Sequence, residues 1–146
     1  MYNGMLHAHS GFRWLVIAIL VIAIVKSLIG LLGKKEYDKT DNLIALLLLS
    51  FTHLQLIFGI IMYAVSPKII GMGEAMKNPE LRFWVVEHGF SMLIAIALIT
   101  IGRVVSKKAA TSEIKFKKSV MYYSLAFILI LWAGIIKPSM LGAGMF

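Results

Sequence analysis

The run LIALLLLSFTHLQLIFGIIMYAV, residues 43–65, decides the fold class, because it is almost entirely apolar and carries one histidine near its middle, His53. As an α-helix, residues 41–65 rise about 37 Å, more than the roughly 30 Å thickness of the apolar core of a bilayer. His53 then lies near the bilayer midplane. An unpaired polar group in hydrocarbon costs several kcal/mol, so this imidazole needs a partner within the membrane.

The composition extends the membrane interpretation to the whole chain. Of its 146 residues, 60% are hydrophobic and only 15% are charged, whereas a soluble domain is about 45–50% apolar. The mean hydropathy is +0.86. These values predict an integral membrane protein with a single transmembrane domain, residues 1–146. The absence of cysteine excludes disulfides, thiolate metal sites and thiol nucleophiles.

Three further apolar runs complete a set of four predicted spans. The spans cover about residues 12–32, 42–65, 79–103 and 119–136. No basic segment precedes the first run and no small-residue cleavage site follows it, which favours an uncleaved span over a signal peptide. Asp41 is the expected N-cap of the second span, and Asn78 that of the third, with Pro79 at the first helical position. Short connections between the spans favour an all-α, antiparallel four-helix bundle.

Basic residues gather in two of the three connections between spans. The first connection contains Lys34, Lys35 and Lys39, and the third contains Arg103, Lys107, Lys108, Lys115, Lys117 and Lys118. The positive-inside rule therefore places these connections in the cytoplasm and both termini on the outer, periplasmic side of a bacterial inner membrane. Lys26 lies near the inner end of the first span, where its long side chain can snorkel to the interface. The net charge of +8 reflects this topology and does not indicate a nucleic-acid partner.

The depths of the histidines suggest a shared site in the outer half of the membrane. His53 lies about 18 Å and His88 about 13 Å below the outer ends of their helices, so the two are expected at a similar level. His7 and His9 lie closer to the outer interface. Because these two are separated by two positions, they point about 200° apart on a helix, and only one of them can face a common pocket.

Paired imidazoles inside four-helix bundles are a common way to bind haem b, with one nitrogen on each side of the iron. The flat macrocycle needs small neighbours, and His88 is followed on its helix by Gly89, Ser91 and Ala95. Arg13 and Arg82 stand at the outer mouth, where they could neutralise the two haem propionates. The sequence therefore predicts a haem b site with His53 and His88 as iron ligands and with His7 or His9 as a further candidate.

Structural roles are the alternative for the same residues. A single histidine within a membrane often hydrogen-bonds a neighbouring polar side chain, and Ser50, Thr52, Gln55 and Ser91 are available. Glu87 either pairs with Arg13 or Arg82, or handles protons or a metal ion together with a histidine. The sequence has no hydrolase, zinc-protease, phosphate-loop or dinucleotide-binding motif.

Every histidine lies in one of three segments: LHAHSGFRWLV (6–16), SFTHLQLIFGIIMY (50–63) and LRFWVVEHGFSMLIAIALITIGR (81–103). These segments resemble short four-span bacterial membrane proteins that are classed as cytochrome-b-like. The resemblance implies a haem b electron carrier with His53 and His88 as ligand positions. Larger di-haem four-helix cytochromes place two histidine pairs at two depths, whereas the cytoplasmic half of this chain has no histidine.

The leading hypothesis is therefore a membrane cytochrome that exchanges electrons between a quinol and a partner or partner subunit on the outer side, rather than a stand-alone enzyme. The first alternative is a cofactor-free membrane scaffold or accessory subunit of a larger complex. The second is a small protein that handles protons or metal ions through Glu87 and the histidines.

Overall fold

The computed structural model describes residues 2–67, 69 and 71–143, and every regular element in that part of the chain is helical. The elements are α1 (Tyr2–Leu32), α2 (Lys39–Val65), α3 (Met72–Ala75), α4 (Pro79–Arg82), η1 (Phe83–Glu87), α5 (His88–Lys108), α6 (Ser112–Leu131), η2 (Trp132–Ile136) and α7 (Lys137–Met140). The segments η1 and η2 are π-helical and run directly into their α-helical neighbours. Four continuous helices are long and apolar enough to cross a membrane, namely Tyr2–Leu32, Lys39–Val65, Pro79–Lys108 and Ser112–Met140.

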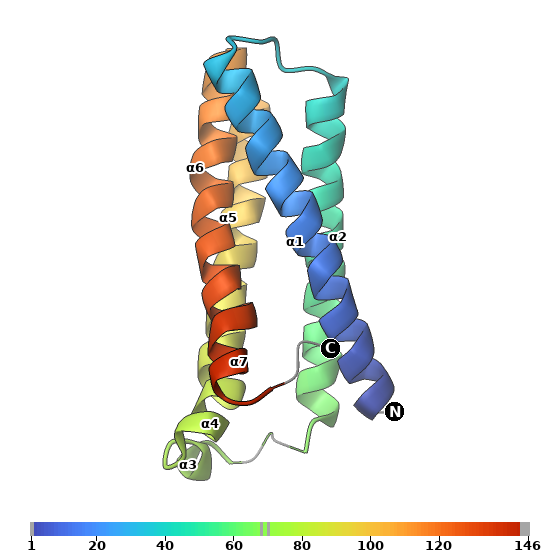
Figure 1. Cartoon of the computed structure of the whole chain (residues 1–146), viewed down its shortest axis with the longest axis vertical. Helices are drawn as coiled ribbons and strands as arrows, with labels where there is room; N and C mark the ends of the chain where they lie inside the picture. Colours follow the sequence, from blue (N-terminus) through green and yellow to red (C-terminus); the bar gives the residue numbers. More distant parts are fainter. Residues whose placement is uncertain (1, 68, 70, 144–146) are drawn as a thin grey trace.

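The four long helices form an elongated antiparallel bundle, which confirms the predicted helical architecture (Figure 1). The α1–α2 and α5–α6 connections lie together at one end, which we call the loop end. The start of α1, the short helices α3 and α4, and α7 lie at the opposite end, which we call the terminal end. The pairs α5–α6 and α1–α2 pack most extensively, α1 also packs along α6, and α2 touches α5 much less.

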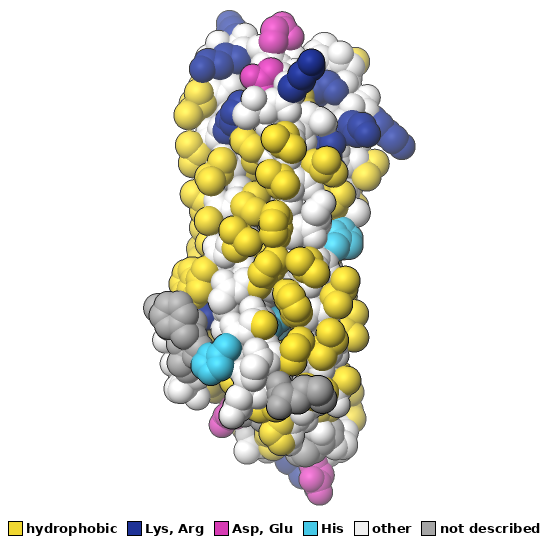
Figure 2. All heavy atoms as spheres, turned by 90° about the vertical axis from the view of Figure 1, so that its right-hand side faces the viewer, with side chains coloured by type: hydrophobic (Ala, Val, Ile, Leu, Met, Phe, Trp, Pro, Cys, Tyr) yellow, Lys and Arg dark blue, Asp and Glu magenta, His cyan; other side chains and the backbone are white. Residues whose placement is uncertain are grey.

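The core is a column of side chains from all four long helices. It consists of Ile17, Leu20, Ala23, Leu48, Ala95, Ile99, Tyr123, Ala126 and Ile130. The outer surface is also apolar over much of its length, and Lys and Arg side chains gather at the loop end (Figure 2). An apolar belt with a basic end is the surface that a bilayer-spanning bundle requires.

The helix starts follow from local capping, with one correction to the sequence prediction. Asp38, and not Asp41, caps α2, because its Oδ1 accepts a hydrogen bond from the Asp41 backbone at 2.9 Å, while Asp41 Oδ2 accepts one from the Asp38 backbone at 2.9 Å. This reciprocal capping box places Asp41 one turn inside the helix. The predicted cap at Asn78 with Pro79 at the first helical position is confirmed. Helix α1 begins at Tyr2, ahead of the predicted span 12–32, so the histidine-containing N-terminal stretch is helical.

Candidate functional site at the terminal end

Two of the four histidines come together inside the terminal end of the bundle. His9 on α1 and His88 at the start of α5 are both partly buried, and their ring centroids are 6.4 Å apart with 72° between the ring planes. His7 and His53 are exposed on the outside of the bundle. The structure therefore pairs His88 with His9 across α1 and α5, rather than with His53 across α2 and α5.

His88 is fixed by a hydrogen bond to the backbone of a neighbouring helix. Its Nδ1 donates to the carbonyl oxygen of Ala133 at 2.8 Å. A carbonyl can only accept, so this contact assigns the proton of the neutral ring to Nδ1 and leaves a lone pair on Nε2. Phe83 and Trp84 flank the imidazole, with ring centroids 5.8 and 5.6 Å away. The ring is thus oriented, and one nitrogen remains open for a ligand.

The two π-helical segments lie on either side of this contact. A π-turn shifts the backbone bonding to five residues and disturbs the regular α-helical ladder, and such turns are frequent at functional sites. In η2, Ala133 O accepts from His88, and the next carbonyl, Gly134 O, accepts from Arg13 Nη1 at 2.8 Å. In η1, Val85 O accepts from the Tyr63 hydroxyl at 3.2 Å. Side chains from α1, α2 and α5 therefore hold both irregular segments.

His9 is held by its backbone, whereas its ring retains an unused polar atom. The side-chain amide of Gln55 donates to the His9 carbonyl oxygen at 2.9 Å. The ring packs against Gly59, where an added Cβ would lie 3.5 Å from His9 Cε1. His9 Nδ1 is buried and has no hydrogen-bond partner among the residues that the structure describes. A buried nitrogen without a partner calls for an explanation, and a bound ligand is one.

His53 lies on the outside of α2 because of its position on the helix. The buried positions of α2 are Asp41, Ala45, Leu48 and Thr52, which recur at three- and four-residue intervals. His53 follows Thr52 and is rotated from it by about 100°, so it points away from the bundle. Its Nδ1 donates to Leu49 O in the preceding turn at 2.8 Å. These buried positions form a stripe along α2. The periodicity of that stripe is visible in the sequence, but the prediction compared the histidines only by their distance from the helix ends.

The arginines and Glu87 behave in different ways. Arg82 Nε donates to Glu87 Oε1 at 2.7 Å, which confirms the expected pairing of Glu87 with an arginine. Arg13 lies one helical turn after His9, and its guanidinium stands 5.4 Å from the centroid of the Trp14 ring in addition to its bond to Gly134. Arg13 is thus part of the histidine site, whereas the charge of Arg82 is already matched by a carboxylate.

The loop end contains a polar cluster that the sequence analysis missed. Lys26 Nζ lies 2.5 Å from Asp41 Oδ1, and Arg103, which is only 6% exposed, donates to Asn42 Oδ1 at 2.7 Å. Lys26 is therefore paired across helices, where the sequence suggested snorkelling. Beside them, burial raises the pKa of Tyr37, although the Arg103 cation partly offsets this rise. Opposite charges near the same end of consecutive spans could have indicated the Lys26–Asp41 pair.

Within the described residues, no group of three or more His, Cys, Asp or Glu side chains is positioned to hold a metal ion. No family model, no curated protein and no solved structure matches the chain. The function of the chain is therefore inferred from the geometry of its own residues.

Proposed function

We propose that the protein is a multi-pass membrane electron carrier that holds one haem b at the terminal end, with His9 and His88 as its axial ligands. The observation that carries this proposal is the neighbouring pair of imidazoles. His9 Nδ1 has no hydrogen-bond partner among the described residues, and His88 Nε2 carries a lone pair. This choice revises the ligand pair expected from depth alone, in which His53 took the place of His9.

The spacing of the pair suits one iron atom between two rings. His9 and His88 would hold the iron through one nitrogen of each ring, and their ring centroids lie 6.4 Å apart.

The haem would supply one-electron redox chemistry when bound. The protein would orient the two ligand histidines and adjust the charge around the haem. The Ala133 carbonyl holds His88 by its Nδ1 proton and increases the basicity of Nε2. Arg13 brings a positive charge beside both histidines and is therefore the candidate to support a propionate. The apolar bundle excludes water from the site, and a quinol or a partner subunit would exchange electrons with it.

The proposed orientation places the loop end in the cytoplasm and the histidine site near the periplasmic face of a bacterial inner membrane, because the basic connections lie at the loop end. A reporter fused after Lys108 is then expected to be cytoplasmic, and one fused after Gly73 to be periplasmic. The reverse result at both positions would overturn the orientation.

The spectrum of the purified protein tests the haem proposal. Protein produced with ample haem is expected to show a strong Soret band and, when reduced, the sharp α-band of low-spin six-coordinate haem b. His9→Gly and His88→Gly should each convert the spectrum to high-spin or lose the haem, and added imidazole should restore the low-spin bands by replacing the lost ligand. His7→Ala and His53→Ala are matched controls and should keep the spectrum. Loss of the low-spin signal in His53→Ala, with His9→Gly unaffected, would contradict the ligand assignment.

A cofactor-free scaffold is the second candidate, and one observation favours it. The bonds of His88 to Ala133, Arg13 to Gly134 and Gln55 to His9 already join different helices without any added group. A protein that remains colourless when haem is abundant would reject the cytochrome proposal and favour this role.

A further inference from the structure

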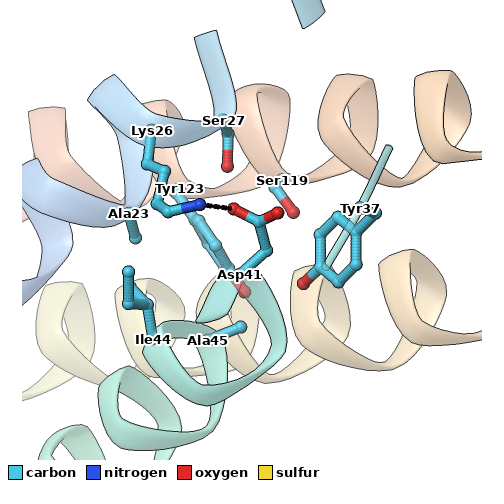
Figure 3. Close-up of a pocket in the computed structure, with 9 residues that line it drawn as sticks. All are labelled: Ala23, Lys26, Ser27, Tyr37, Asp41, Ile44, Ala45, Ser119 and Tyr123. Carbon is cyan, nitrogen blue, oxygen red and sulfur yellow. Dashed lines mark hydrogen bonds and ion pairs between the residues drawn. The ribbon is translucent and has the colours of Figure 1, made fainter. Parts of the chain in front are cut away.

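A small cavity at the loop end lies next to the buried Lys26–Asp41 pair, far along the bundle from the histidines. Its volume is about 10 Å³, and it is lined by Ala23, Lys26, Ser27, Tyr37, Asp41, Ile44, Ala45, Ser119 and Tyr123. Figure 3 shows these side chains converging from α1, α2, α6 and the α1–α2 connection, with the Lys26–Asp41 contact between them. Polar groups from four segments thus surround one space.

The hydroxyl of Tyr123 provides independent evidence that something binds there. Tyr123 is only 1% exposed, and its buried hydroxyl makes no hydrogen bond of good geometry among the described residues, since its contact with Ser119, which itself donates to Ser106 at 3.1 Å, falls short of that geometry. An unsatisfied buried hydroxyl costs about 1–3 kcal/mol, so such groups in folded proteins usually meet a partner or an ordered water. The Asp41 carboxylate and the Ser119 hydroxyl line the same cavity and can supply further hydrogen bonds.

We propose that this cavity is a binding site for one water molecule, which joins the Tyr123 hydroxyl to the Lys26–Asp41 pair. A polar cavity needs about 10–15 Å³ and two to four polar partners to hold a water, and this one meets both conditions. The only charged side chains in the lining are Lys26 and Asp41, whose charges cancel. The site therefore suits a neutral ligand better than a sodium ion. The water ties α6 to α1 and α2 at the loop end.

Hydroxyl-radical footprinting of the purified protein in lipid nanodiscs tests the water directly, because radicals generated from a bound water label its neighbours even when they are buried. Tyr123 is expected to be oxidised several-fold faster than Phe116, each rate being normalised to the unfolded chain. Phe116 is a matched control, since it is on the same helix, aromatic and also 1% exposed. Equal protection of the two residues would overturn the proposal.

The sign of the effect of Tyr123→Phe is the second test. If water binds, removing the hydroxyl takes away one of its partners, and the thermal midpoint should fall by about 3 °C. If the hydroxyl is truly unsatisfied, its removal should leave the midpoint unchanged or raise it, which would overturn the proposal. Tyr122→Phe is the control, because Tyr122 does not line the cavity. A midpoint of the wild-type protein that depends on sodium rather than choline chloride would also overturn it, in favour of a cation.

Discussion

The loop end and the terminal end of the bundle differ in how their helices approach one another, and their glycines show this most directly. A Cβ added at Gly30 would lie 2.4 Å from Phe116 Cζ, and one added at Gly102 would lie 2.6 Å from Tyr122 Cβ. At the terminal end, a Cβ added at Gly11 or Gly89 would meet nothing within 4 Å. The loop end therefore depends on close helix packing at Gly30 and Gly102, whereas at the terminal end Gly11 is exposed and a Cβ added at Gly59 would make only an ordinary contact, 3.5 Å from His9 Cε1.

The two ends also differ in what their polar side chains bond to. At the loop end, opposite charges on different helices pair directly, as Lys26 does with Asp41. At the terminal end, His88 and Arg13 bond to the carbonyls of a π-helical segment, and His9 Nδ1 is left without a partner among the described residues. The loop end is held by charge pairing between helices, whereas His88 and Arg13 at the terminal end bond to backbone carbonyls.

The largest effect is expected from Gly30→Ala. The new methyl group overlaps the ring of Phe116, which is 1% exposed and has little room to move. Overpacking of this kind costs about 1–3 kcal/mol, more than the gain of up to about 1 kcal/mol from the higher helix propensity of alanine. Thermal or denaturant unfolding in detergent should show the loss of stability.

Gly11→Ala is the matched control for Gly30→Ala, because it makes the same substitution at a position with free space. No atom obstructs its new methyl group, so we expect stability within about 0.5 kcal/mol of wild type, or a gain of up to about 1 kcal/mol. A loss as large as that of Gly30→Ala would show that overlap with Phe116 is not the cause of the destabilisation.

A smaller loss is expected from Asp41→Asn, which removes the charge that Lys26 faces. Breaking a fully buried ion pair costs about 3–5 kcal/mol, but Lys26 can still reach solvent and an exposed pair is worth at most about 1 kcal/mol, so we expect a loss of about 1 kcal/mol. The side chain of Lys26 is 36% exposed and that of Asp41 only 6%. Denaturant unfolding measures the loss, and restoration of stability in Asp41→Asn combined with Lys26→Met would attribute it to the unpaired lysine.

Asp38→Asn is the matched control and should have the smallest effect. Asp38 lies 3.8 Å from Lys26, its side chain is 59% exposed, and asparagine retains the ability to cap α2. Hydrogen bonding from the Asp41 backbone lowers the pKa of Asp38, so its charge stabilises the fold at neutral pH. That contribution is lost as the pH falls through the lowered pKa, and Asp38→Asn should remove this part of the acid sensitivity. An effect equal to that of Asp41→Asn would place the critical charge at the cap instead.

Some features of the structure were predicted from the sequence, and others were not. Four long apolar helices, their antiparallel order and the Asn78–Pro79 helix start followed from hydropathy and local capping, which depend on neighbours in the chain. The pairing of Glu87 with an arginine was expected as well, with Arg13 and Arg82 both open, and the structure identifies Arg82 as the partner. The N-cap of α2 was misplaced, because Asp38 and Asp41 are both good caps and their reciprocal bonding decides between them.

The sequence by itself determined the all-helical class and the number of long apolar helices, because apolar length and periodicity are properties of a single chain segment. Only the tertiary structure decided which histidines meet. Depth along a helix is read from residue number, whereas the direction of a side chain depends on how each helix is rotated against its neighbours. That rotation buries Thr52, turns His53 outward, and brings His9 to His88.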